Sequence, residues 1–183
     1  MNKNKEKIYS ISAIVIMIDQ IIKILISTKM KLNEEIEVIP NFFSINFVKN
    51  KGAAFSILQD QKIILVIISL VVLFFLNKYI EKNKNYNKLS IISLGFIIGG
   101  IVGNLLDRLI QDGVIDYLSF QFGKYFFPIF NLADSFIIIG MILIIINMIN
   151  EEKEEISVKE KLSKQVEIIK NDNKKKTKTK KKT

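Results

Sequence analysis

Four long apolar segments limit what this chain can fold into more than any other feature of its sequence. They span residues 8–26, 63–80, 89–110 and 126–149, and each is about long enough to cross a hydrocarbon layer ~30 Å thick as a helix. The second is the weakest, because it needs Lys78 to extend its side chain to the membrane surface. A soluble fold would require four helices that are apolar on every side. The sequence therefore predicts an all-α membrane protein with four transmembrane helices.

The first apolar segment also resembles a signal peptide, because a basic N-terminus precedes it. It lacks a cleavage site of small residues after a short apolar core, and its apolar part continues past Asp19 and Lys23. Since three further spans follow, we interpret it as a retained first helix.

Composition narrows the chemistry that the chain can perform. The 183 residues contain no Cys, His or Trp. This argues against disulfides, against thiol or Ser–His nucleophiles, and against zinc sites built from His or Cys. Carboxylates, amides, hydroxyls, Lys and Arg remain available. The sequence thus predicts neither a metal ion nor another cofactor.

Lysine outnumbers acidic residues in three segments: the N-terminus, the stretch between the second and third spans, and the tail after the fourth, whereas the five Lys of residues 27–62 are accompanied by four acidic residues. An excess of Lys marks cytoplasmic segments, so we expect both termini in the cytoplasm and the loops 27–62 and 111–125 on the outer face. The tail, 151–183, starts acidic and ends in KKKTKTKKKT. We expect residues 1–150 to form the transmembrane domain and the tail to be a mostly disordered cytoplasmic extension. Without aromatic interleaving, the tail predicts no nucleic-acid partner.

This orientation brings polar residues of three spans to one depth, near the outer surface. Asp19 and Lys23 lie one turn apart on one face of the first span. The third and fourth spans add, near their outer ends, Asn104, Asp107, Arg108, Asn131 and Asp134. Pro128 suits the start of the fourth helix. Polar residues of unrelated origin would not be expected to share a depth.

Structural explanations remain open for some of these residues. Asp19 and Lys23 fit a self-contained ion pair at the i,i+4 spacing of a helix. Arg108 fits a pair with Asp107, or a side chain that reaches the lipid headgroups. Asp134 is harder to explain in this way, because no Lys or Arg lies within a turn or two of it in the sequence.

The second outer loop supplies another carboxylate that can meet Asp134. Its sequence GVIDYLSFQFG alternates apolar and polar residues, as a short strand does, and contains Asp116. A short loop makes the two flanking helices neighbours, so Asp116 and Asp134 can converge. Two close carboxylates share a proton near neutral pH. The ionised group can then activate water for attack on an amide while the protonated group donates to the carbonyl oxygen.

The first outer loop contains NFFSINFVKNKGAAFS. Its alternation from Phe43 to Phe47 predicts a strand at the membrane interface. Asn50 can bond an extended peptide, and the small residues Gly52, Ala53 and Ala54 allow a close backbone approach. An ordinary hairpin turn explains the same pattern.

Five motifs in this order resemble the lipoprotein signal peptidases, also called signal peptidase II. The motifs are DQIIK, NKGAAFS, GNLLDR, VIDY and FNLADS. The resemblance covers residues 8–149 and leaves out the Lys-rich tail. It departs from many members at Tyr117, where they carry Phe.

The resemblance implies an aspartic endopeptidase of the bacterial cytoplasmic membrane, with four transmembrane helices and a small outward-facing β-cradle. Such an enzyme cuts prolipoproteins just before the diacylglyceryl-modified Cys and is inhibited by globomycin. The resemblance implies Asp116 and Asp134 as the catalytic dyad. Residues expected to bind substrate or support the site are Asp19, Lys23, Asn50, Gly52, Asn104, Arg108, Asn131 and Ala133. Expected partners are the lipidated precursor and membrane lipid, and nothing in the sequence demands more than a monomer.

Two other classes of protein are compatible with parts of the pattern. A small ion-coupled transporter would use the same charged residues, although transporters place them near the midplane and often show internal repeats. A non-catalytic membrane scaffold would use Gly99, Gly100 and Gly103 for helix packing.

Overall fold

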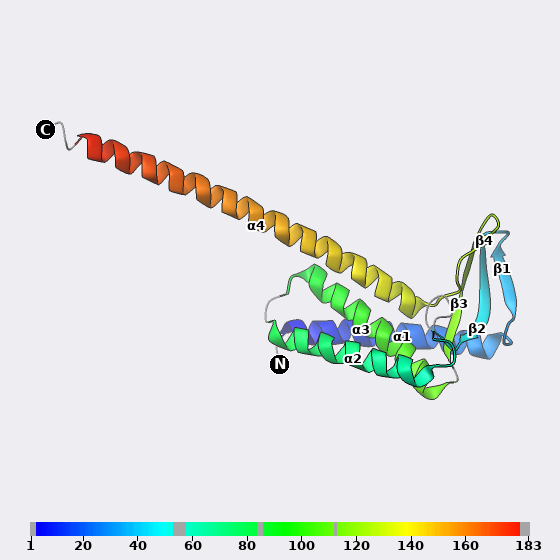
Figure 1. The fold of residues 1–183 in the computed structure, drawn as a ribbon. Coiled ribbons are helices and arrows are strands. Elements are labelled where there is room, and N and C mark those ends of the chain that lie inside the picture. Colours follow the sequence, from blue (N-terminus) through cyan, green and yellow to red (C-terminus); the bar gives the residue numbers. More distant parts are fainter. Residues whose placement is uncertain (1–2, 53–57, 84–85, 112, 180–183) are drawn as a thin grey trace. The chain divides into compact units, whose positions relative to one another are not determined.

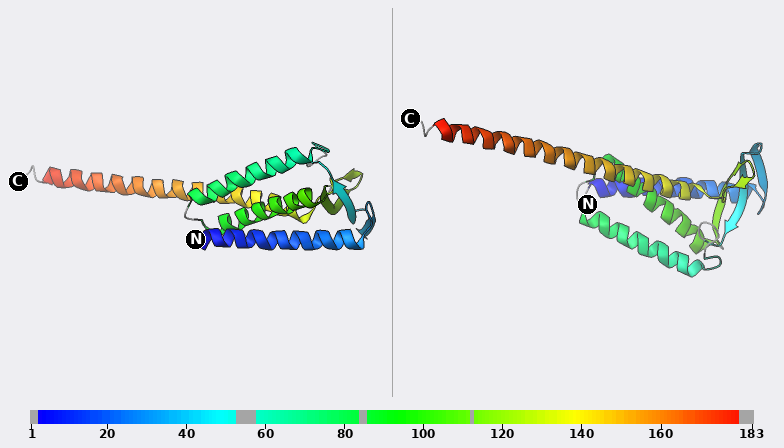
Figure 2. Two further views of the ribbon diagram at one scale, coloured as in Figure 1. Left: turned by 90° about the horizontal axis from the view of Figure 1, so that it is seen from below. Right: turned by 45° about the horizontal axis from the view of Figure 1, so that its top comes forward.

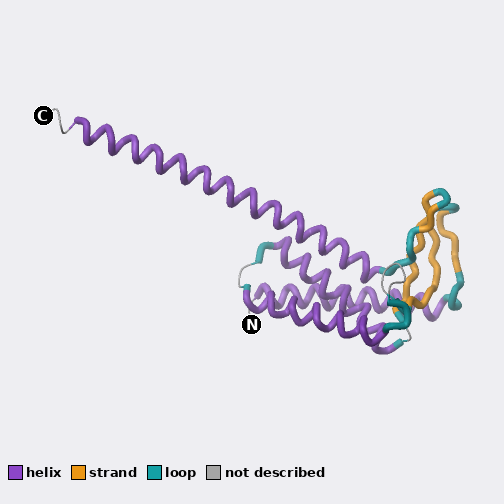
Figure 3. Tube along the Cα trace, in the orientation of Figure 1, coloured by secondary structure: helices purple, strands orange, loops and turns teal. Residues whose placement is uncertain are grey.

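The computed structural model describes residues 3–52, 58–83, 86–111 and 113–179. They form four helices and four strands (Figures 1 and 3). In chain order the elements are α1 (Lys3–Lys29), β1 (Glu35–Ile39), β2 (Phe43–Asn50), α2 (Lys62–Lys82), α3 (Lys88–Ile110), β3 (Val114–Phe122), β4 (Tyr125–Phe126) and α4 (Leu132–Thr179). The chain divides into two compact units, Met1–Ile144 and Ile145–Thr183.

All four helices are long and apolar enough to span a membrane. The most apolar stretches of α1, α2, α3 and α4 have mean hydropathies of 1.9, 2.6, 2.1 and 2.4. Most apolar side chains of α2 are exposed, as expected of a helix that faces lipid rather than water. The prediction of four spanning helices and a small β element is confirmed.

Helix α3 is the most buried of the four and contacts its neighbours through glycines. A Cβ atom at Gly99 would lie 2.9 Å from the backbone oxygen of Ser12 in α1, and one at Gly140 of α4 would lie 2.8 Å from the backbone oxygen of Ser93 in α3. Glycine therefore lets the backbones of these helices approach closely. This packing brings the polar residues near the ends of α1, α3 and α4 within reach of one another.

The strands form one antiparallel sheet in the order β1-β2-β3-β4. It lies at the end of α1 where the chain leaves that helix (Figure 2). A cluster of buried side chains joins α1 to the sheet and consists of Met30, Phe47, Ile115 and Tyr117. The strands predicted from both outer loops are present: β2 extends beyond the alternation from Phe43 to Phe47, and β3 covers most of GVIDYLSFQFG. Opposite Asp116, β2 places Val48, beyond a register shift that follows Ile45. Ala53 and Ala54 lie outside the described residues.

The fourth helix starts later than the sequence indicated. Phe126, expected at the start of the span, pairs with Gln121 in strand β4, where the preceding Tyr125 pairs with Phe122. The backbone N–H and C=O of Phe130 then both bond to Leu118, so the chain stays extended up to this point. Pro128 therefore precedes the helix and does not belong to its first turn.

Helix α4 continues beyond its apolar part to Thr179, whereas the sequence predicted a mostly disordered tail. Glu and Lys are good helix formers, and Lys159 forms an i,i+4 ion pair with Glu155 at 3.1 Å. The helix propensity of Glu and Lys thus accounts for the helical tail, whose sequence lacks the apolar pattern that would have predicted a helix.

Candidate active site

The start of α4 lies beside the buried part of β3 and carries two of the predicted site residues. Asn131 is the residue before the helix, and its side-chain oxygen accepts a hydrogen bond from the N–H of Asp134 at 2.9 Å. In return, the carboxylate of Asp134 accepts the N–H of Asn131 at 3.2 Å. This reciprocal arrangement is a capping box, with Asp134 as the third helical residue. It fixes the Asp134 side chain and places a negative charge where the helix dipole favours one.

Two other elements satisfy the remaining N–H groups of this first turn. The N–H of Leu132 donates to the hydroxyl oxygen of Tyr117 on β3 at 3.2 Å. The N–H of Ala133 donates to Asp19 on α1 at 3.1 Å. Burial raises the pKa of the Tyr117 hydroxyl, which therefore stays neutral. The first N–H groups of a helix have no partner within the helix, and here α1 and β3 supply partners for two of them.

Asp116 of β3 is 2% exposed, and each of its oxygens accepts an amide N–H. Asn131 donates to Oδ1 at 2.7 Å, and Asn50 donates to Oδ2 at 2.8 Å. Burial raises the pKa of Asp116 to about 7, and the nearby charge of Asp134 adds to this effect. The hydrogen bonds from the two side-chain amides act in the opposite direction. Near neutral pH, Asp116 thus exists in protonated and ionised forms in comparable amounts.

The amide groups around the two carboxylates have fixed orientations. The oxygen of Asn104 accepts Lys23 Nζ and Asn131 Nδ2, both at 3.0 Å. Its nitrogen must therefore donate, and it lies 2.7 Å from Asp134 Oδ1. Asn131 in turn touches both Asp116 and Asp134, so a single residue joins the two carboxylates.

Lys23 lies behind this centre and is 1% exposed. It pairs with Asp19 at 2.8 Å, as the helical spacing predicted, and also with Asp107 of α3 at 2.9 Å. A self-contained pair with Asp19 is therefore only part of its role. Gly103 has to be glycine here, because a Cβ would lie 2.6 Å from a carboxylate oxygen of Asp19.

In the part of the chain that the structure describes, Arg108 neither pairs with Asp107 nor extends toward the lipid headgroups, the two structural roles that the sequence left open. It donates to the backbone oxygen of Gly52 at 3.4 Å and to that of Asn104 at 3.3 Å, and within the described residues it forms no ion pair with Asp107. Asp107 instead binds Lys23 and accepts the N–H of Ile115 at 3.1 Å. Arg108 therefore ties the segment after β2 to α3.

The structure brings all the predicted site residues into one hydrogen-bonded network. They are Asp19, Lys23, Asn50, Gly52, Asn104, Arg108, Asp116, Asn131, Ala133 and Asp134. Asp107 and Gln20 also belong to this network but were not among the predicted site residues, although the sequence placed Asp107 at the same depth. Asp107 lies one turn from Asn104, the spacing that selected Arg108, and could have been found in the same way. Gln20, which donates to Asp107 and to the backbone of Gly103, gave no such signal.

Among the described residues, no group of three acidic side chains is arranged to hold a metal ion. Every buried side-chain nitrogen or oxygen in that part of the chain has a hydrogen-bond partner. At the centre of the network are two carboxylates held by amide donors. Together with four spanning helices, this arrangement defines the class of membrane-bound aspartic peptidases.

Comparisons with known proteins identify the family within this class. The family described as signal peptidase (SPase) II matches residues 11–150, and the chain belongs to it. Over 146 residues the chain is 40% identical to the lipoprotein signal peptidase of Halothermothrix orenii, which covers 80% of this chain and 97% of that protein. It is 39% identical over 146 residues to the lipoprotein signal peptidase of Bacillus pumilus, and the match covers 80% of this chain and 94% of that protein.

Solved structures agree with this assignment. A bacterial membrane enzyme matches with a TM-score of 0.72 and 36% identity, covering 78% of this chain and 87% of that chain. A second bacterial membrane enzyme matches with a TM-score of 0.68 and 37% identity, and the match covers 75% of this chain and 89% of that chain. The family predicted from five motifs is confirmed: the protein is a membrane aspartic peptidase that removes signal peptides from prolipoproteins. The Lys-rich tail lies beyond the residues that match the family.

Proposed function

We propose that Asp116 and Asp134 are the catalytic dyad and that the substrate is a precursor cut just before its diacylglyceryl-modified Cys. One observation carries this proposal. The side-chain amide of Asn131 donates a hydrogen bond to Asp116, and that of Asn104 donates one to Asp134. Asn131 also donates to the oxygen of Asn104, so the two carboxylates belong to one hydrogen-bonded unit. Two carboxylates so linked, one of them with a pKa of about 7, suit a pair that shares one proton.

In the proposed mechanism Asp116, the more deeply buried acid, holds the proton and Asp134 is ionised. Asp134 takes a proton from water as the water oxygen attacks the scissile carbonyl carbon. Asp116 donates its proton to the carbonyl oxygen, giving a neutral tetrahedral intermediate. Collapse of this intermediate breaks the C–N bond as Asp134 passes its proton to the leaving amine and Asp116 recovers its own. The dyad thus returns to its starting state without a covalent intermediate.

The proposed position of the site explains the preference for a lipidated precursor. Two acyl chains anchor a Cys residue stably in the bilayer, close to the interface. With the sheet on the outer face and both termini in the cytoplasm of the cell, the dyad meets the scissile bond at that depth. We propose that the protein works there as a monomer in the cytoplasmic membrane, and that globomycin inhibits it.

The experiment that tests this function compares two precursors of one sequence, with and without the diacylglyceryl group. Purified protein in liposomes is expected to cleave the lipidated precursor at least about a hundredfold faster, because two buried acyl chains hold the bond at the site. Release of the signal peptide is followed by mass spectrometry. Equal rates for the two precursors would contradict the anchoring argument, and failure to cleave either would contradict the function itself.

The pKa of Asp116 predicts how activity and stability depend on pH. If Asp116 supplies the proton, kcat falls about tenfold per unit as the pH rises above about 7. The raised pKa also means that the folded state binds more protons than the unfolded state between pH 3.8 and about 7. The stabilisation from protonated Asp116 is thus complete below pH 3.8 and lost as the pH rises to about 7. Rate profiles and thermal unfolding over this range check both trends, and an activity that rises through pH 8 would reverse the assignment of the proton.

A further inference from the structure

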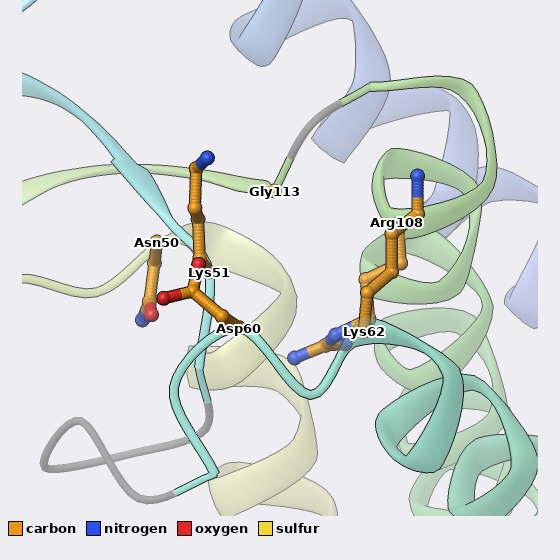
Figure 4. A pocket seen from close by; sticks show the side chains of 6 residues that line it. All are labelled: Asn50, Lys51, Asp60, Lys62, Arg108 and Gly113. Carbon is orange, nitrogen blue, oxygen red and sulfur yellow. The ribbon is translucent and has the colours of Figure 1, made fainter.

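An open hollow lies beside the candidate active site and is not used by the mechanism above. Its empty volume is about 320 Å³ including its mouth, and it is lined by Asn50, Lys51, Asp60, Lys62, Arg108 and Gly113. Figure 4 shows these side chains around one opening, with Asn50 on one side and Arg108 and Lys62 on the other. Of the residues that line this hollow, Asn50 and Arg108 were expected from the sequence to bind substrate or support the site.

The hollow is connected to Asp116 by one hydrogen bond and to Asp134 by two in succession. Asn50, which lines it, donates to Asp116 at 2.8 Å. Arg108, which also lines it, donates to the backbone oxygen of Asn104, whose side chain donates to Asp134. A peptide held at the dyad would therefore have a neighbouring side chain within reach of this hollow.

Three cationic side chains and one carboxylate line the hollow, so its charge is positive. Lys62 donates to the backbone oxygen of Gln111 at 3.0 Å, and this bond uses one of its three N–H groups. Arg108 uses two of its five N–H groups on backbone oxygens. Within the described part of the chain, neither of these two residues forms an ion pair. The hollow is therefore suited to an anionic group of about the size of a carboxylate.

We propose that this hollow is a subsite for an acidic side chain of the precursor, within three residues of the scissile bond. This inference rests on the proposed function. The carboxylate of the substrate accepts hydrogen bonds from Arg108 and Lys62, and the carboxylate of Asp60 offsets part of the positive charge of the hollow. A lipid headgroup phosphate has the same chemistry, and the experiment separates the two sources.

The test uses diacylated peptides in dodecyl maltoside that differ only by Gln or Glu at one position, for the three positions before the scissile bond and the two positions after the modified Cys. At one or more positions, Glu is expected to raise kcat/KM about threefold to tenfold, mainly by lowering KM. Raising the ionic strength from 0.05 to about 0.5 M is expected to reduce this preference, because salt screens partly exposed charges.

Lys62→Glu is the variant that tests the assignment of the subsite. At the favoured position it is expected to remove the preference for Glu and to favour a peptide with Lys there. Lys62 is the first residue of α2, where an acidic side chain suits the helix dipole, so the variant should fold. Lys124→Glu, an exposed residue of the β3–β4 turn that does not line the hollow, is the matched control and should keep the preference.

Each result supports or overturns the proposal. Rates that agree within twofold for all Gln and Glu peptides, with efficient cleavage, would overturn the subsite and leave the proposed function intact. Cleavage of no diacylated peptide would overturn both. A preference that disappears when phosphatidylglycerol is added at constant ionic strength would show that a lipid headgroup occupies the hollow, and would also overturn the proposal.

Discussion

Replacing Asp116 or Asp134 by Asn is expected to lower kcat for a diacylated precursor by about a thousandfold or more, because each variant loses one partner in proton transfer. The two oxygens of each carboxylate accept N–H donors: Asn50 and Asn131 at Asp116, and Asn104 and the Asn131 backbone at Asp134. An introduced amide presents its own N–H group to one of these donors, so a modest loss of stability accompanies the loss of activity. KM should change little.

Three measurements separate lost chemistry from lost structure in these variants. Cleavage rates are compared with thermal unfolding in detergent and with the amount of protein inserted in the membrane. Asp172→Asn, in the tail beyond the residues that match the family, makes the same chemical change and should retain full activity. Normal turnover by either folded dyad variant would remove that residue from the mechanism.

Replacing Lys23 by Met is expected to destabilise the protein by about 3–5 kcal/mol, because it leaves buried carboxylates without their counter-charge. Asp19 and Asp107 are 0% and 1% exposed, and both lie within 3 Å of the Lys23 nitrogen. The oxygen of Asn104 would also lose one donor. For a protein of this size, the loss corresponds to a fall in Tm of roughly 6–20 °C.

The control for Lys23→Met is Lys29→Met, the same change at an exposed position at the end of the same helix. It should leave Tm within about 2 °C of the wild type, as surface changes usually do. Adding Asp107→Asn to Lys23→Met should recover part of the lost stability, since one uncompensated charge is removed. An unchanged Tm for Lys23→Met alone would mean that the buried ion pairs contribute little.

The proposed dyad could be predicted from the sequence because its two acids break strong local patterns. Asp116 interrupts an alternating strand, and Asp134 interrupts an apolar helix that has no Lys or Arg nearby. Their convergence followed from a short connection between two helices. The pairs Asp19–Lys23 and Asn104–Arg108 could be predicted from helical spacing, since residues three or four apart on a helix share a face.

Other parts of the site could not be predicted because they depend on partners distant in the sequence. Strand β1 and the late start of α4 are set by pairing with β2 and β3, not by the pattern of their own residues. Whether Arg108 pairs with Asp107 was undecidable from spacing alone. Lys23 of α1 takes that carboxylate, which leaves Arg108 to bond the backbone of Gly52.

The fixed amides of Asn50, Asn104 and Asn131 have a consequence for the energetics of the reaction. Each oxygen is held by a donor of the scaffold: the Gly52 N–H, the Lys23 ammonium and the Asp134 N–H. Each nitrogen therefore faces a carboxylate before any substrate arrives. Dipoles aligned in advance need not turn as charge moves during bond cleavage, so reorganisation of the protein adds little to the activation barrier.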